Sequence, residues 1–280
     1  MRTKASSSVR NQEKHLDKGL ALYSEELTLF PALTEALKNL DTIPESDDLK
    51  IYKRERRKAV LLVKRPNNEG GSLVIKGFPL VKFSNQIRPG RFGQMEAHNM
   101  LQAEQQGIKS PRYLGFFEFR KFGLTKANGV IMEPLGSHKT LMEFAKENSA
   151  DAEKAFNLAI PTIAKLYRLG TNHIDVSPHN IMAENLDDLP YLIDWQACRF
   201  IGPKNDRQLI LQGAQFLRYL NNVFPLASQK EWLSTLYRTV NPEIPEELFL
   251  KNSIHYAHQP RPSHEFRYRL DFDLNQVQTF

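Results

Sequence analysis

The chain has 280 residues, of which 41% are hydrophobic and 25% are charged. This composition excludes an intrinsically disordered or fibrous protein and is ordinary for a globular one. No apolar run is long enough to span a bilayer, and the one cysteine, Cys198, excludes a disulfide within the chain.

The net charge is +6 and the isoelectric point is about 9.2. We therefore expect an anionic partner: a nucleotide, a phosphorylated substrate, an anionic lipid surface or nucleic acid. Nucleic acid rests on charge alone and is the weakest of these, and a solvated basic surface would carry the same charge. The lone cysteine and the basic N-terminus without a following apolar segment favour a cytoplasmic protein, with peripheral contact at the inner membrane face as an option. The sequence does not indicate an oligomeric state.

Residues 1–48 are expected to form a helical extension with a disordered start. The first dozen residues are polar and basic. From His15 to Leu40, apolar residues recur at helical spacing, and Pro31 is expected to divide this stretch into two helices. The remainder, 41–48, is the predicted linker.

Residues 49–135 have a strand-rich pattern. Apolar and β-branched runs predict five strands, with a helix between the third and the fourth. The strands are expected over 49–52, 59–64, 72–78, 113–119 and 129–133, and the helix over 92–106. This order predicts a five-stranded antiparallel sheet with one helix.

Residues 136–254 are helix-rich, and 255–280 are basic and aromatic. The fold class is therefore predicted as α+β, with a small strand-rich lobe followed by a mainly helical lobe. The last segment is either a solvated tail packed by its own rings or a basic arm for a phosphorylated or acidic-sugar acceptor. Helices are expected over 140–146, 151–169, 206–220 and 228–239, the second of them ended by Gly170.

The most informative pattern is H-x-D-x-x-x-x-N over 173–180, followed by an apolar run that ends in Asp194. Phosphoryl transfer from ATP needs a carboxylate near the acceptor hydroxyl, for which Asp175 is the candidate. It also needs ligands for the magnesium ion that bridges the phosphates, for which Asn180 and Asp194 are the candidates. The alternative is a helix–loop–strand segment in which Asp175 and Asn180 only cap turns.

These motifs resemble the catalytic loop and the metal-binding aspartate of the protein-kinase-like fold. The chain resembles most the bacterial lipopolysaccharide (Kdo-type) kinases and the related aminoglycoside-phosphotransferase-like group, over about residues 50–220. The Ser177-Pro178-x-Asn180 form is also similar to RIO-type atypical kinases. The resemblance is carried by 73–78, 96–101, 107–111, 132–135, 173–180 and 193–195.

The resemblance implies a two-lobed kinase-like fold that uses ATP and Mg²⁺, with Asp175 as the catalytic base and Asn180 and Asp194 as metal ligands. It implies a phosphate-binding lysine at Lys76, paired with Glu96 on the following helix; Lys82 and Glu104 are the second choices. Taken alone, Lys76 is better explained as an ordinary exposed strand lysine and Glu96 as a surface helix residue, and the downstream motif reverses that preference.

The segment after the last predicted strand is the implied hinge, where main-chain groups of Glu133 to Leu135 would meet the adenine edge. Pro134 has no N–H, so Leu135 is the favoured donor. His173 is expected to support the main chain around the metal ligand.

Two features depart from protein kinases. The first hairpin, Lys53–Lys58, has basic residues where a glycine-rich loop would cover the phosphates. Its side chains could instead bind phosphate or an anionic membrane, which sedimentation with anionic and neutral liposomes would test. The second departure is the short span from Asp194 to the next helix near Asp206, which argues against a peptide-docking activation segment.

The leading hypothesis is an ATP- and Mg²⁺-dependent phosphotransferase acting on a hydroxyl of a small molecule or glycolipid, such as a lipopolysaccharide-core sugar. The alternatives are an atypical, RIO-like serine/threonine protein kinase and a catalytically silent pseudokinase that serves as a scaffold.

Overall fold

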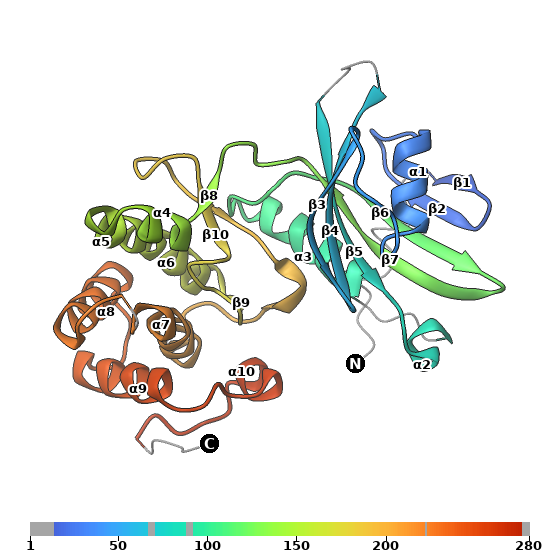
Figure 1. Ribbon diagram of the computed structural model, residues 1–280. Coiled ribbons are helices and arrows are strands. Elements are labelled where there is room, and N and C mark those ends of the chain that lie inside the picture. Colours follow the sequence, from blue (N-terminus) through green and yellow to red (C-terminus); the bar gives the residue numbers. More distant parts are fainter. Residues whose placement is uncertain (1–13, 67–70, 88–91, 222, 276–280) are drawn as a thin grey trace. The chain divides into compact units, whose positions relative to one another are not determined.

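A computed structural model describes residues 14–66, 71–87, 92–221 and 223–275 (Figure 1). Contacts within the chain divide it into two compact units. Unit 1 runs to Gln105 and resumes over Pro111–Gly136. Unit 2 holds Gln106–Ser110 and everything from Ser137 onward.

Unit 1 is built on an antiparallel sheet with the strand order β1-β2-β6-β7-β5-β4-β3. The prediction of five strands is wrong because the N-terminal segment adds two. The strands are β1 (Lys14–Asp17), β2 (Leu20–Tyr23), β3 (Leu49–Glu55), β4 (Lys58–Lys64), β5 (Ser72–Pro79), β6 (Tyr113–Lys121) and β7 (Leu124–Met132).

The predicted helical extension is also wrong over 14–23, where β1 and β2 form a hairpin. Gly19 turns the chain with a φ of +85°, and a Cβ there would lie 2.2 Å from the Arg120 carbonyl oxygen. Leu20 and Leu22 then face the core while Leu16 is exposed. A short apolar run is compatible with both the helical and the strand periodicity. Here the segment is a strand because β2 pairs with β6.

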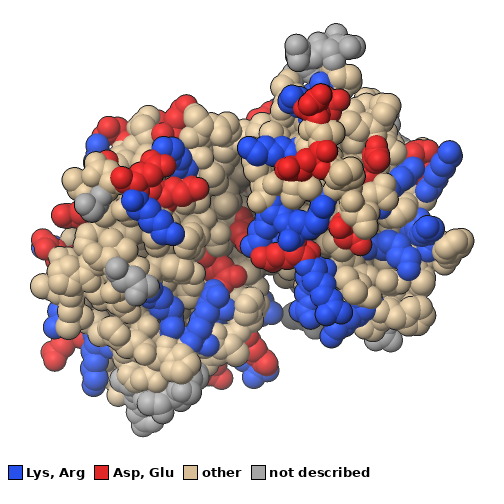
Figure 2. Space-filling view, viewed as in Figure 1, with Lys and Arg blue, Asp and Glu red and all other residues tan. Residues whose placement is uncertain are grey.

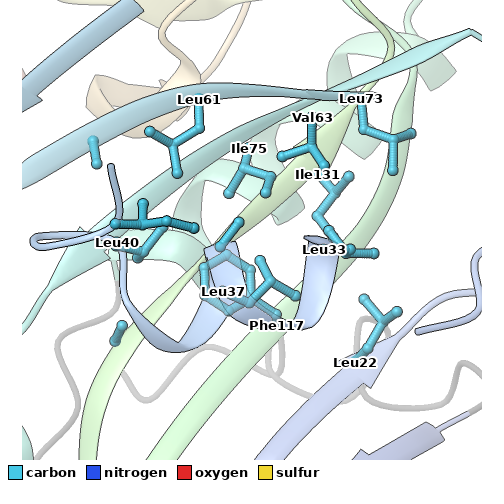
Figure 3. Close-up of a cluster of buried hydrophobic side chains, with 14 of the residues drawn as sticks. Leu22, Leu33, Leu37, Leu40, Leu61, Val63, Leu73, Ile75, Phe117 and Ile131 are labelled. Carbon is cyan, nitrogen blue, oxygen red and sulfur yellow. The ribbon is translucent and has the colours of Figure 1, made fainter. Parts of the chain in front are cut away.

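Helix α1 (Pro31–Lys38) covers one face of this sheet. Pro31 starts the helix instead of dividing two, because proline is favoured in the first helical turn. Leu33 and Leu37 of α1 pack against Ile75, Phe117 and other buried side chains of the strands (Figure 3). The added N-terminal segment therefore completes the core of unit 1.

The predicted helix of unit 1 is present as α3 (Phe92–Gln105), and a short helix, α2 (Phe83–Ile87), precedes it. A Cβ at Gly93 would lie 2.7 Å from the Gly129 nitrogen, so glycine lets α3 approach β7 closely. The Gly93 N–H donates to Asn128 Oδ1 at 3.2 Å. This contact fixes the start of α3 against the sheet.

Unit 2 is mainly helical and carries two small sheets, ordered β11-β10-β8 and β12-β9. Its strands are β8 (Lys139–Thr140), β9 (Thr171–His173), β10 (Ile181–Ala183), β11 (Tyr191–Leu192) and β12 (Cys198–Phe200). Its helices are α4 (Leu141–Glu147), α5 (Ala152–Asn157), α6 (Ala159–Leu169), α7 (Asp206–Leu220), α8 (Leu226–Val240), α9 (Glu246–His258) and α10 (His264–Arg269).

The helix predicted over 151–169 is two helices, α5 and α6. Pro161 lies in the first turn of α6, where its missing N–H is tolerated. The boundary between α5 and α6 therefore lies just before this proline. Gly170 ends α6 as predicted, in the left-handed region with a φ of +66°.

The prediction of a tail from residue 255 is wrong. Helix α9 continues to His258 and α10 follows after a short loop. Tyr256 is fully buried, and its ring contacts Phe266 and Phe272 at 6.1 and 5.3 Å between centroids. The aromatic residues therefore form a core that folds this segment back onto unit 2. Over the described ranges, none of the helices has the length and apolarity needed to span a membrane.

Candidate active site

The two candidate metal ligands lie at one end of a single hairpin in unit 2. Strands β10 and β11 pair with Ile181 opposite Leu192. One residue further, the Ile193 N–H donates to the Asn180 carbonyl at 2.9 Å. Asn180 and Asp194 therefore flank the open end of this hairpin, although 13 residues separate them in the chain.

The catalytic-loop candidate Asp175 is tied to the same place. Asn180 Nδ2 donates to the Asp175 carbonyl oxygen at 2.9 Å, so a metal would be bound through the amide oxygen of Asn180. Turn capping accounts for the bond between Asn180 and Asp175, whereas the pairing of β10 with β11 brings Asp194 to the same place. The pattern H-x-D-x-x-x-x-N thus predicted residues that the fold brings together.

His173 has a supporting position, as expected. It is fully buried, and its Nε2 lies 3.2 Å from the Ile193 carbonyl oxygen. Its ring meets the Trp195 ring edge-on at 5.3 Å, and Trp195 Nε1 donates to the Leu192 carbonyl at 3.0 Å. Both side chains contact main-chain carbonyls just before Asp194, which has a left-handed φ of +66°. A positive φ at a non-glycine residue is uncommon and often marks a functional site.

An oxygen-donor set of this kind suits Mg²⁺. The ion is bound in phosphotransferases by one or two carboxylates or amides together with phosphate oxygens and waters. One carboxylate from Asp194 and one amide oxygen from Asn180 fit that requirement. Within the described residues there is no cluster of three or more His, Cys, Asp or Glu side chains that could hold a metal by itself.

In unit 1, Lys76 and Glu96 form an ion pair. The Lys76 Nζ lies 2.6 Å from Glu96 Oε2, and their side chains are 6% and 1% exposed. Lys76 lies on the interior strand β5, between β4 and β7, while Glu96 lies in the first turns of α3. The second choices, Lys82 and Glu104, are both exposed. The expected pairing is therefore found, and its role in binding phosphate stays a proposal.

The predicted hinge begins where expected, because β7 ends at Met132. The Glu133 N–H donates to the Arg112 carbonyl at 3.0 Å, and its carboxylate accepts from Arg112 Nη1 at 2.7 Å. Arg112 also bonds Glu26. Glu133 is thus engaged within unit 1, and the contact of Leu135 with adenine stays a prediction that rests on the missing N–H of Pro134.

The glycine-free hairpin is more tightly closed than the sequence suggested. Strands β3 and β4 stay paired up to Glu55 and Lys58, so Arg56 and Arg57 form a two-residue turn. Both arginines are exposed. Figure 2 shows basic side chains gathered over this end of β3 and β4. No glycine is available in this turn to let main-chain amides approach a phosphate.

Sequence reasoning missed the two partners of the Asp175 carboxylate. Arg267 Nη1 donates to Asp175 Oδ1 at 2.8 Å, and Arg261 Nη2 bonds the same oxygen. Both arginines come from the C-terminal segment, about 90 residues further along the chain. The arginine-rich composition was the available signal, but the segment was expected to be a tail.

Known proteins similar to this chain include two curated kinases of 3-deoxy-D-manno-octulosonic acid (Kdo) from Vibrio vulnificus strains YJ016 and CMCP6. Each is 28% identical over 103 residues, which is 37% of this chain and 42% of the relative. The match therefore spans less than half the length of these relatives. No family model matches the chain. The resemblance to Kdo-type kinases is confirmed over that stretch.

Among solved structures, WaaP in complex with acyl carrier protein aligns with a TM-score of 0.53 and 12% identity. The alignment covers 80% of this chain and 89% of that one. WbdD aligns with a TM-score of 0.48 and 19% identity, over 82% of this chain and 50% of that one. The likeness to WaaP shows a shared fold and confirms the α+β class.

Proposed function

We propose that the protein is a phosphotransferase that moves the terminal phosphoryl group of ATP, with Mg²⁺, to a hydroxyl of a sugar acceptor. The observation that carries this proposal is the convergence of Asp175, Asn180 and Asp194 at the open end of the β10–β11 hairpin. These are the groups that phosphoryl transfer requires.

In this proposal Asp175 orients the acceptor hydroxyl and takes its proton. The hydroxyl oxygen bonds to the γ-phosphorus of ATP while the bond from that phosphorus to the ADP oxygen breaks, and ADP leaves. Asn180 and Asp194 hold the metal ion, which neutralises charge on the phosphate oxygens when bound. In unit 1 the Lys76 ammonium, held in place by Glu96, binds phosphate oxygens. The main chain at Leu135 is the proposed contact for adenine.

The proposed acceptor is a sugar of lipopolysaccharide, free or lipid-linked. Support comes from the two relatives named as kinases of 3-deoxy-D-manno-octulosonic acid. The short span of 11 residues between Asp194 and the start of α7 at Asp206 also favours a small acceptor over a docked peptide.

A pseudokinase is the second candidate, and the closed hairpin at Arg56 and Arg57 favours it. Without glycine there, the main chain cannot cover the phosphates closely. The same exposed arginines carry the further proposal of peripheral contact with anionic lipid.

Thermal melting with and without ATP plus Mg²⁺ tests the proposal. We expect Mg²⁺-dependent stabilisation of the wild type, since a ligand that binds only the folded state raises the melting temperature. Asp194→Ala should lose the shift and phosphoryl transfer. Asp175→Asn should keep the shift and lose roughly 10²- to 10⁴-fold in turnover, the range for a positioned general base.

Asp187→Ala is the matched control, because Asp187 is exposed at the opposite end of the same hairpin. It should transfer phosphate from radiolabelled ATP to 3-deoxy-D-manno-octulosonic acid as the wild type does. A shift without transfer to any free or lipid-linked sugar would favour the pseudokinase. Full turnover in Asp194→Ala would overturn the pseudokinase and the proposed role of Asp194 as a metal ligand.

A further inference from the structure

Two guanidinium groups bond the carboxylate of Asp175 in unit 2, and the charge of a third acts on them. Arg267 and Arg261 both bond Asp175 Oδ1. Arg218 of α7 bonds the Tyr256 carbonyl oxygen and lies 3.3 Å from the Pro260 carbonyl oxygen, next to Arg261 in the chain. We call Arg218, Arg261 and Arg267 the arginine cluster.

Arg267 is the fixed member of the cluster. Its side chain is only 4% exposed, and its Nη1 also donates to the Ile174 carbonyl at 2.6 Å. Its Nε donates to the Pro262 carbonyl at 3.1 Å, and its own carbonyl accepts from Asn172 at 2.9 Å. These bonds on several sides make Arg267 a positioning residue that sets the direction of the Asp175 carboxylate.

Arg261 differs from Arg267 in exposure. It lies in the loop between α9 and α10, and its side chain is 43% exposed. A guanidinium with this exposure can exchange one carboxylate partner for another at small cost, because solvent screens the intermediate state.

The charges of the cluster do not balance. Asp175 is the carboxylate that bonds Arg261 and Arg267, and the contacts of Arg218 are to carbonyl dipoles, which carry no net charge. Burial lowers the pKa of Arg218, and the charges of Arg261 and Arg267 lower it further. Burial also lowers the pKa of Arg267, with Arg261 adding to the decrease and Asp175 opposing it. Such an excess of positive charge favours an additional anion.

We propose that Arg261, backed by Arg218, forms a subsite for an oxyanion of the acceptor, either a carboxylate or a phosphate group, beside the catalytic Asp175. The planar guanidinium fits both groups through paired hydrogen bonds. The inference rests on the proposed function and extends it, because it assigns the acceptor a negative charge close to the hydroxyl that is phosphorylated. Arg267 keeps Asp175 in place while Arg261 binds the acceptor.

Calorimetric titration of the full chain with three probes tests the subsite: 3-deoxy-D-manno-octulosonic acid, its uncharged methyl ester and inorganic phosphate. The variants are Arg261→Gln and, as a matched control, Arg269→Gln. Arg269 lies on α10, is 67% exposed and pairs with Glu265 instead of Asp175.

We expect Arg261→Gln to weaken binding of the sugar acid at least tenfold, because a charge-assisted hydrogen bond is lost. The methyl ester should bind the wild type about as weakly as the acid binds Arg261→Gln, and Arg269→Gln should stay within about twofold of the wild type. Arg261-dependent binding of phosphate without binding of the sugar acid would identify a phosphate group as the anion.

Equal binding of acid and ester, unchanged binding in Arg261→Gln, or binding of none of the three probes would overturn the subsite. The proposed function is judged separately. A wild type that melts higher with ATP and Mg²⁺ and phosphorylates acid and ester equally is a kinase without this subsite. A wild type with no such shift but with Arg261-dependent binding of the acid has the subsite without the activity.

Discussion

Glu96 in unit 1 and Asp175 in unit 2 are both carboxylates held by basic side chains, but they are held in opposite ways. Glu96 is paired with Lys76, and both side chains are almost fully buried. Asp175 is 23% exposed and shares one oxygen between two arginines, one of them buried and one exposed.

Because of this difference in burial and charge, the ion pair at Glu96 is fixed, whereas the carboxylate at Asp175 can exchange its partners. A buried pair of equal and opposite charges is neutral as a unit. Removing one partner leaves the charge of the other in a low-dielectric interior without that partner, which is costly. A partly exposed carboxylate with excess positive charge around it tolerates a change of partner. The buried pair suits holding an ammonium in position, and the arginine cluster suits receiving a charged ligand.

The largest expected effect comes from breaking the buried pair. Glu96→Ala leaves the Lys76 ammonium buried without its carboxylate, and such a loss costs about 3–5 kcal/mol of stability. We expect a large drop in the melting temperature together with loss of phosphoryl transfer.

The double variant Lys76→Met with Glu96→Leu is the control, because it removes both charges and keeps the volume. It should melt well above Glu96→Ala and still fail in transfer. If both variants melt like the wild type, the Lys76–Glu96 pair is not a buried ion pair that stabilises unit 1.

A smaller effect is expected from Arg267→Gln, which removes the guanidinium from Asp175 and from the Ile174 carbonyl. Leaving that buried acceptor unsatisfied should cost about 1–3 kcal/mol. Since Arg267 positions Asp175, kcat should fall about tenfold or more while KM for ATP stays near the wild-type value.

Arg267→Lys should recover part of kcat, and steady-state kinetics measure both constants. Arg261→Gln should instead raise KM for the acceptor. A decrease in stability with normal kcat in Arg267→Gln would limit Arg267 to a structural role.

The smallest effect concerns His264 at the start of α10. Burial lowers its pKa from the usual 6.5, and Arg267 and Arg261 lower it further, while Asp175 opposes them. Because the folded-state pKa is depressed, the neutral form is favoured on folding. Its contribution to stability is fully present above pH 6.5 and is lost as the pH falls from 6.5 through the lower folded-state pKa.

Removing a positive charge by Arg261→Gln should raise the pKa of His264 toward its usual value. An NMR titration of the histidine ring protons measures this, with Arg269→Gln compared in parallel. An unchanged His264 pKa in Arg261→Gln would show that Arg261 is too far away to contribute to the cluster.

Local sequence patterns were sufficient to predict those parts of the candidate site that lie within one short stretch of the chain. The spacing of Asp175 and Asn180 and the apolar run before Asp194 are set within about 20 residues, and the β10–β11 hairpin follows from them. The pairing of Lys76 with Glu96 was also predicted, because a strand and the next helix place these residues together.

Long-range contacts decided what the sequence could not. The sequence of 14–23 is compatible with both helix and strand, and the pairing of β2 with the edge of β6 makes it a strand. Arg261 and Arg267 could be placed at Asp175 only after Tyr256, Phe266 and Phe272 had packed α9 and α10 into one core. The sequence by itself determined which residues are proposed to carry phosphoryl transfer, whereas the tertiary structure decided which charges surround them. The physical reason is that periodicity and spacing report local geometry, and electrostatic partners depend on how distant segments pack.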